Sequence, residues 1–281
     1  MGGDAQLDNV TKTLNASGFD KAVVVIRPQI SARPLKNNNQ RMILVKMKNG
    51  ELKNNERIVY GLIITIVVFA IAVFSGSNIH LNIDFFPSSF LTHSLMLILS
   101  IILIYSLRKY VNYKIEVPQF KKILKPLLFG LLAAIIVNIL MTVIIKILGG
   151  TVEAHSALAK MTPLQIFVFV CIYASIAEEI LFRGFLMNIL KPLKIKGIKI
   201  FKRNISIPVI ISAVAFGLAH LIVITTGAGG FLLLRIVVFT TILGLIAGYY
   251  QEKYDNNAYA IVVHMAGNLM AVIGALLMNL N

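Results

Sequence analysis

Ser175-Ile-Ala-Glu178-Glu179-Ile-Leu-Phe-Arg183-Gly184 is the stretch of this chain that decides its fold and points to its function. It places two carboxylates and one guanidinium inside a long run of apolar residues. A charged side chain near the middle of a bilayer costs about 3 kcal/mol on insertion scales. Acidic residues in such a run therefore indicate a functional site.

The composition of the chain is strongly apolar. Of its 281 residues, 57% are hydrophobic and only 14% are charged, and the mean hydropathy is +0.81. Soluble domains carry about one quarter charged residues, so this composition indicates a membrane protein. The net charge of +15 does not indicate a nucleic-acid partner, because Lys and Arg lie in short clusters between apolar runs. The single cysteine, Cys171, excludes an internal disulfide.

Seven apolar segments follow a polar, basic tail, and each is near the roughly 20 residues that a helix needs to span hydrocarbon. We expect a tail at 1–57 and a membrane domain at 58–281. The sequence predicts an all-α, polytopic transmembrane helix bundle of about seven helices, with room for an eighth or re-entrant element in 108–125 or 150–162. The expected spans are Ile58–Ser75, Phe90–Leu107, Pro126–Leu148, Pro163–Leu190, Ile207–Thr225, Gly230–Tyr250 and Ala258–Leu280.

The connections between the segments predict the orientation in the membrane. Residues 108–125 and 191–206 each hold six Lys or Arg, whereas 76–89 and 226–229 hold none and 149–162 hold only Lys160. Connections rich in Lys and Arg stay in the cytoplasm. We therefore expect a cytoplasmic N-terminus and an external C-terminus, and the Asn- and Lys-rich loops favour a bacterial plasma membrane.

Few titratable side chains lie inside the predicted spans. Of the twelve acidic residues only Glu178 and Glu179 do so, and of the five histidines only His220 and His264 lie well inside. At about 1.5 Å per helical residue, these groups are expected to converge between the midplane and the cytoplasmic surface. We interpret the remaining histidines, including His93, as solvated residues in outer loops or at a segment edge.

Helical spacing separates the roles of the three charged residues. Glu179 and Arg183 are four residues apart, in the favourable order for an ion pair. Glu178 is rotated by about 100° from Glu179. One arginine cannot satisfy two carboxylates, so a purely structural network is the weaker interpretation. We expect Glu179 and Arg183 to support the site and Glu178 to stay free to act.

Two further motifs lie on later segments. Phe216 and His220 are four residues apart and share one helix face, and His264 and Asn268 share a face of the last segment. Polar contact between helices is the simpler interpretation of each motif alone. Their joint occurrence with the acidic motif favours one shared site, in which Phe216 has a structural role.

Together the motifs resemble the CPBP (Abi) family of intramembrane proteases, which includes type II CAAX prenyl endopeptidases and bacteriocin self-immunity proteins. The resemblance covers a core of about 120–281 and implies an endopeptidase whose site opens toward the cytoplasm. Its partners would be the lipid bilayer and a membrane-associated peptide or protein substrate, lipidated or not. Three complete motifs carry it: Glu178-Glu179-xxx-Arg183, Phe216-xxx-His220 and His264-xxx-Asn268.

Two chemistries are open for the implied site. Without a metal, Glu178 is the base that activates water and His220 holds the water. His264 and Asn268 then face the oxyanion. With a metal, Glu178, His220 and His264 form a His2Glu zinc set, although the chain has no HExxH motif. The cofactor stays unassigned, and the metal-free mechanism is favoured.

Two other classes of function stay open. A catalytically inactive member of the same fold would act as a membrane scaffold or immunity protein by binding a partner. An ion-coupled transporter would use the buried Glu and His residues as a relay, although no pair of broken helices supports it. The variant Glu178→Ala distinguishes an enzyme from a scaffold, because a scaffold would keep its effect.

Overall fold

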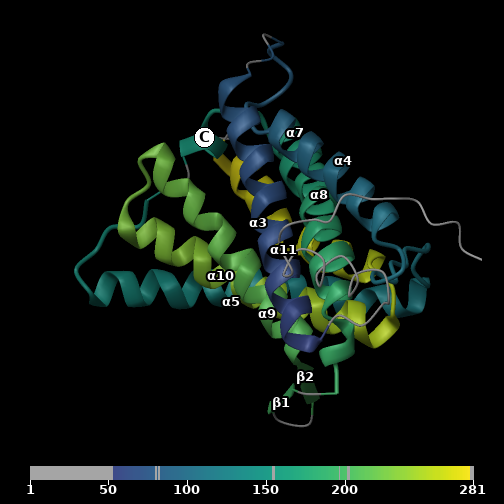
Figure 1. The fold of residues 1–281 in the computed structure, drawn as a ribbon. Coiled ribbons are helices and arrows are strands. Elements are labelled where there is room, and N and C mark those ends of the chain that lie inside the picture. The colour runs from purple at the N-terminus through teal and green to yellow at the C-terminus, as the bar shows by residue number, and fades with distance from the viewer. Residues whose placement is uncertain are drawn as a thin grey trace, which may run out of the picture. The chain divides into compact units, whose positions relative to one another are not determined.

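The computed structural model describes residues 53–278 except residues 80, 82, 154, 155, 196, 201 and 202. The predicted tail at 1–57 lies almost wholly outside the described residues, so its boundary stays a prediction. Six described helices are long and apolar enough to cross a membrane, and α4 is a shorter apolar helix. The predicted all-α polytopic bundle is therefore confirmed (Figure 1).

The observed helices agree with the predicted spans to within a few residues at most ends. The largest difference is at α5, which begins before Pro126 because its first turns carry Lys121, Lys122 and Lys125 and give no hydropathy signal. The bounds are α3 (Asn54–Asn78), α4 (Phe90–Ser106), α5 (Phe120–Ile147), α9 (Ile207–Ala219), the 3₁₀ helix η4 (His220–Thr226), α10 (Gly230–Tyr254) and α11 (Ala258–Met278).

The helix that carries the acidic motif is continuous but irregular, and we call it the motif helix. It begins after Thr162, whose hydroxyl accepts from the backbone N–H of Gln165 at 3.2 Å, with Pro163 in the first turn. Wide π-helical turns flank the short regular piece that carries the two acids, and such turns are frequent at functional sites. Its parts are α7 (Pro163–Gln165), η1 (Ile166–Ala174), α8 (Ser175–Glu179) and η2 (Ile180–Met187).

The connection after the motif helix contains a small β-hairpin that the sequence does not predict. A 3₁₀ turn, η3 (Lys191–Leu193), leads into β1 (Gly197–Ile200) and β2 (Arg203–Ser206), which pair antiparallel. Strands of four residues are too short to show a clear period in the sequence. Elsewhere, the described residues of 108–125 and 150–162 hold only α6 (Ser156–Ala159) and the start of α5, so no eighth span lies there.

One end of the bundle collects the Lys- and Arg-rich connections, and we call it the basic end. The backbone N–H of Asn257 donates to the carbonyl oxygen of Lys114 at 2.9 Å, and Lys191 donates to Asp255 at 2.8 Å. This hydrogen bond from Lys191 holds the pKa of the Asp255 carboxyl below its usual value. The basic end consists of the connections 107–119, 190–206 and 255–257.

The opposite end carries few cations, and we call it the bare end. The side chain of Gln165 donates to the carbonyl oxygen of Asp84 at 3.1 Å, and the backbone N–H of Gly229 donates to Glu153 at 3.1 Å. These contacts bring connections that are far apart in sequence to the same level of the bundle. The bare end consists of the described residues of the connections 79–89, 148–162 and 227–229.

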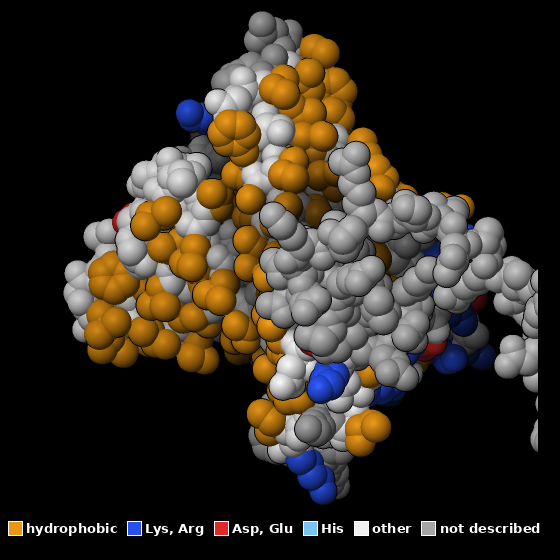
Figure 2. All heavy atoms as spheres, in the orientation of Figure 1, with side chains coloured by type: hydrophobic (Ala, Val, Ile, Leu, Met, Phe, Trp, Pro, Cys, Tyr) orange, Lys and Arg blue, Asp and Glu red, His pale blue; other side chains and the backbone are white. Residues whose placement is uncertain are grey.

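Hydrophobic side chains cover much of the described surface between the two ends. On the face shown in Figure 2 they form a broad area, and most visible Lys and Arg side chains gather toward its lower edge and right. Inside the bundle, small residues let helices approach closely. A Cβ atom at Gly244 of α10 would lie 3.1 Å from the Cα atom of Ala213 in α9, and one at Gly248 would lie 3.0 Å from Val209. The bundle is therefore built for close helix contact inside and lipid contact outside.

Candidate active site

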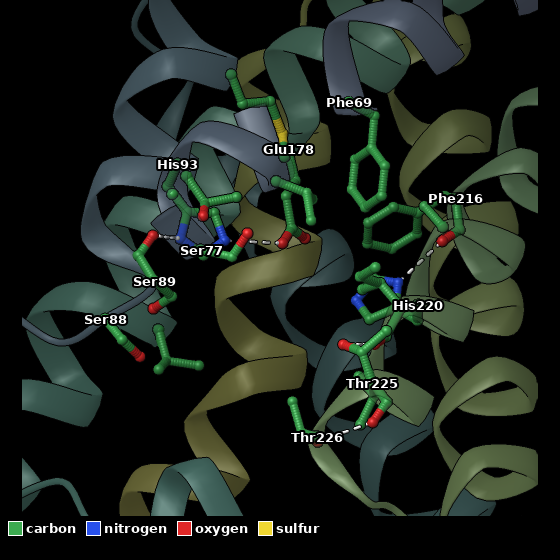
Figure 3. A pocket seen from close by; sticks show the side chains of 18 of the residues that line it. Phe69, Ser77, Ser88, Ser89, His93, Glu178, Phe216, His220, Thr225 and Thr226 are labelled. Carbon is green, nitrogen blue, oxygen red and sulfur yellow. Dashed lines mark hydrogen bonds and ion pairs between the residues drawn. The ribbon is translucent and has the colours of Figure 1, made fainter. Parts of the chain in front are cut away.

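Glu178 lines a cavity and contacts a histidine from another helix. Nε2 of His93, on the first turn of α4, lies 3.2 Å from Oε1 of Glu178. The two side chains are 16% and 14% exposed, so the contact is shielded but reachable. Figure 3 shows them pointing toward one another, with His220 on the facing wall of the cavity.

The hydrogen bonds of His93 place a shared proton at Glu178. Nδ1 of His93 lies 2.9 Å from the carbonyl oxygen of Ser89, which can only accept, so Nδ1 carries a hydrogen. A neutral ring would then turn the lone pair of Nε2 toward a carboxylate oxygen, which is repulsive. A proton therefore lies between Nε2 of His93 and Oε1 of Glu178, held by one or the other.

Glu179 lies in a buried ion pair beside Glu178. Its Oε1 accepts from a guanidinium nitrogen of Arg183 at 3.0 Å and from Nδ1 of His264 at 2.9 Å. The side chains of Glu179 and Arg183 are 1% and 0% exposed. Two partners therefore already engage this oxygen of Glu179. Glu178 is the carboxylate that faces open space.

Arg183 is enclosed by the elements that surround the motif helix. Its guanidinium carbon lies 4.5 Å from the centre of the Phe216 ring, a cation–π contact. A Cβ atom at Gly244 would lie 2.5 Å from a guanidinium nitrogen, so the arginine fits only because α10 has a glycine there. Asn257 donates to the carbonyl oxygen of Glu179 at 3.3 Å. These contacts hold the motif helix in one rotation about its axis.

Phe216 orients two histidines of the site. Its carbonyl oxygen accepts from Nδ1 of His220 at 2.9 Å, which leaves Nε2 of a neutral His220 as an acceptor. Its ring packs edge-on against His220 and His264, with centres 4.9 and 5.3 Å apart. Nε2 of His264 lies 3.7 Å from Oε2 of Glu178. The structure thus brings both predicted motif histidines close to the acidic motif.

Asn268 reaches the motif helix from α11. Its amide nitrogen donates to the carbonyl oxygen of Val170 at 3.1 Å and to the hydroxyl of Ser175 at 3.2 Å. Both amide hydrogens are engaged in this arrangement, so donation to an oxyanion would require one of them to be released. The oxyanion role of Asn268 therefore stays a proposal.

Two cavities meet at Glu178. One, of about 380 Å³, lies among α3, α4 and η4, and the other, of about 620 Å³, lies among α5, α10 and α11. Glu178, His93 and His220 line both cavities, and His264 and Asn268 line the larger one. All four residues predicted to be catalytic therefore line the larger cavity.

The predicted zinc set of Glu178, His220 and His264 stays a prediction, because two of its side chains are engaged with other partners in this arrangement. In the part of the chain that the structure describes, no three His, Cys, Asp or Glu side chains are grouped so that they could hold an ion. Nδ1 of His264 is bound to Glu179, and one oxygen of Glu178 is bound to His93. The residues fit a site for proton transfer.

A comparison with protein families agrees with this geometry. Residues 160–270 match the family model described as type II CAAX prenyl endopeptidase Rce1-like. This segment is similar to an Rce1-like domain. It contains all three motifs, so the predicted relationship to the CPBP family is confirmed over this segment. Comparisons with curated proteins and with solved structures found no match.

His93 is the site residue that the sequence does not reveal, and its interpretation as a solvated histidine is wrong. It lies outside the Rce1-like segment, 85 positions before Glu178. The only feature of His93 that the sequence shows is its position in the first turn of an apolar segment. α4 packs against α8 and η2, and this packing carries His93 to Glu178. A contact between residues so far apart in the chain cannot be predicted from the spacing of nearby residues.

The structural role of Glu179 predicts that its replacement destabilises the protein more than the replacement of an exposed acid. Replacing Glu179 by Gln leaves Arg183 buried without a counter-charge, which should lower the free energy of unfolding by about 3–5 kcal/mol. The matched control is Glu116→Gln, whose exposed pair with Lys114 should contribute about 0–1 kcal/mol. Thermal unfolding of the purified variants in detergent measures both. Equal stability of the two variants would contradict the supporting role of Glu179.

Proposed function

We propose that the chain is an intramembrane endopeptidase in which Glu178 activates a water molecule. The observation that carries this proposal is the division of the acidic pair. Glu179 is neutralised by Arg183 and His264, whereas Glu178 lines both cavities beside His93 and His220. A carboxylate that faces a cavity in an apolar bundle, with titratable partners, is suited to general base catalysis.

The proposed reaction is the hydrolysis of one peptide bond. Glu178 takes a proton from water while the water oxygen attacks the carbonyl carbon of the substrate. The tetrahedral intermediate then collapses, the carbon–nitrogen bond breaks, and Glu178 returns the proton to the leaving nitrogen. His93 keeps the shared proton on Nε2 and donates a hydrogen bond to Oε1 of Glu178, which fixes the direction of the carboxylate.

The other motif residues assist this reaction in distinct ways. Nε2 of His220 accepts a hydrogen bond from the water and so holds it for attack. The amide of Asn268 is a proposed donor to the oxyanion. Nε2 of His264, which faces Glu178, is a second donor when the ring carries a hydrogen on both nitrogens, because Nδ1 already donates to Glu179. Glu179 and Arg183 keep the motif helix in place and take no proton.

The cavities favour a substrate that is at least partly apolar. A third, mostly apolar groove of about 630 Å³ runs between α3 and α9 and shares Phe69, Phe182, Ala219 and Ile222 with the smaller site cavity. An apolar side chain or a lipid anchor of a membrane-associated peptide would fit there. Peptide maturation and bacteriocin self-immunity are the proposed roles, and they rest on the family resemblance.

The central test of the proposed activity is Glu178→Gln, which keeps the shape of the side chain but removes the base. We expect the rate of peptide cleavage by the variant to fall by about 10²- to 10⁴-fold. The membrane peptidomes of cells with wild-type and variant protein supply the measurement, and Glu116→Gln is the matched control. If a folded Glu178→Gln protein retains cleavage or protection in full, the chain acts as an inactive scaffold or immunity protein.

A second prediction concerns His93. His93→Ala removes a hydrogen bond to a charged group, which is worth about 1.5–3 kcal/mol, so kcat should fall by about 10- to 100-fold with little change in KM. His93→Gln should recover part of this loss, because its amide can donate to Glu178. Kinetics on a peptide identified by the peptidome comparison give both values. If His93→Ala changes KM alone, His93 does not position Glu178.

A further inference from the structure

The smaller site cavity opens at the bare end of the bundle. Glu178, His93 and Phe216 line its depth, and its exposed rim consists of four hydroxyl side chains and Ile222. Figure 3 shows several of these hydroxyl residues around the cavity below Glu178 and His220. They lie at the ends of α3 and η4 and before α4, next to the connections 79–89 and 227–229. The exposed hydroxyl residues of the rim are Ser77, Ser88, Thr225 and Thr226.

Toward the basic end the site is closed. Every residue of the motif helix and its continuation from Ile180 to Leu190 is buried. The ion pair of Glu179 with Arg183 lies at the start of this packed section, and Tyr113 packs against Gly184 from the connection 107–119. Burial raises the pKa of the Tyr113 phenol, so this group stays neutral at pH 7. No described residue of the basic-end connections lines either site cavity.

Two predictions from the sequence disagree about the side from which the site is reached. The positive-inside rule places the basic end in the cytoplasm, whereas the family resemblance implies a site that opens toward the cytoplasm. Both cannot hold, because the cavity opens at the end of the bundle opposite to the basic end. The charge bias is a property of this chain itself, with six Lys or Arg in each of 108–125 and 191–206. It therefore carries more weight than the resemblance.

We propose that the site takes its peptide from the non-cytoplasmic side of the membrane. The proposal rests on the proposed protease activity and names its substrate class. The substrates are exported peptides, or proteins anchored in the outer leaflet, whose cleaved bond enters between uncharged hydroxyl side chains.

Site-directed labelling tests the orientation without relying on catalysis. The single cysteine, Cys171, is buried and is replaced by Ala, and one new cysteine is then introduced at the rim or at the basic end. The probes are Ser88→Cys at the rim and Lys194→Cys at the basic end. Intact cells are treated with a membrane-impermeant sulfonated maleimide, and the same cells are treated after permeabilisation.

The expected result is that Ser88→Cys is labelled to the same extent before and after permeabilisation, while Lys194→Cys is labelled only after it. The reverse pattern, or equal labelling of both sites in intact cells, would overturn the proposal. Failure to label Ser88→Cys even after permeabilisation would also overturn it, because the rim would then be closed.

The peptidome comparison of wild type with Glu178→Gln tests the substrate class. The Glu178-dependent cleavage sites should lie in exported or externally exposed segments, and sites in cytoplasmic segments would overturn the substrate class. A peptidome without any Glu178-dependent site would refute the protease activity and the substrate class with it. Labelling would still report the orientation in that case, so the two failures are distinguishable.

Discussion

The buried ion pair between Glu179 and Arg183 is the interaction on which the rest of the structure depends. Both side chains are almost fully enclosed, and a lone charge at this depth would be strongly destabilising. The residues around the pair must therefore stabilise both charges and leave room for them. Phe216 lies against the guanidinium, Gly244 leaves room for it, and His264 donates to the shared carboxylate oxygen.

The same constraint explains why one carboxylate can act and the other cannot. With Glu179 committed to the pair, its neighbour Glu178 projects from α8 into the space where the two cavities meet. His93 on α4 and His264 on α11 approach it from different helices. Beyond the ion pair, the described residues from Ile180 to Leu190 are all buried toward the basic end. The exposed hydroxyl residues of the smaller site cavity lie at the bare end.

Much of this arrangement can be predicted from local patterns. The spans follow from hydropathy, and the pairing of Glu179 with Arg183 follows from their helical spacing. His93 and the hairpin at 197–206 do not follow, because one depends on a contact 85 positions away and the other on strands of four residues. The direction in which the cavity opens also cannot be predicted from local sequence patterns. It depends on which helix ends pack against their neighbours and which leave space between them.

A double-mutant cycle on Glu179 and Arg183 tests the central claim that this pair is structural and Glu178 is the working acid. The variants are Glu179→Gln, Arg183→Met and their combination, each measured for unfolding in detergent and for Glu178-dependent cleavage. The account predicts that the double variant is more stable than either single variant, because no unpaired charge stays buried, and that it keeps measurable cleavage. A folded double variant without any cleavage would contradict it, as would one no more stable than the single variants.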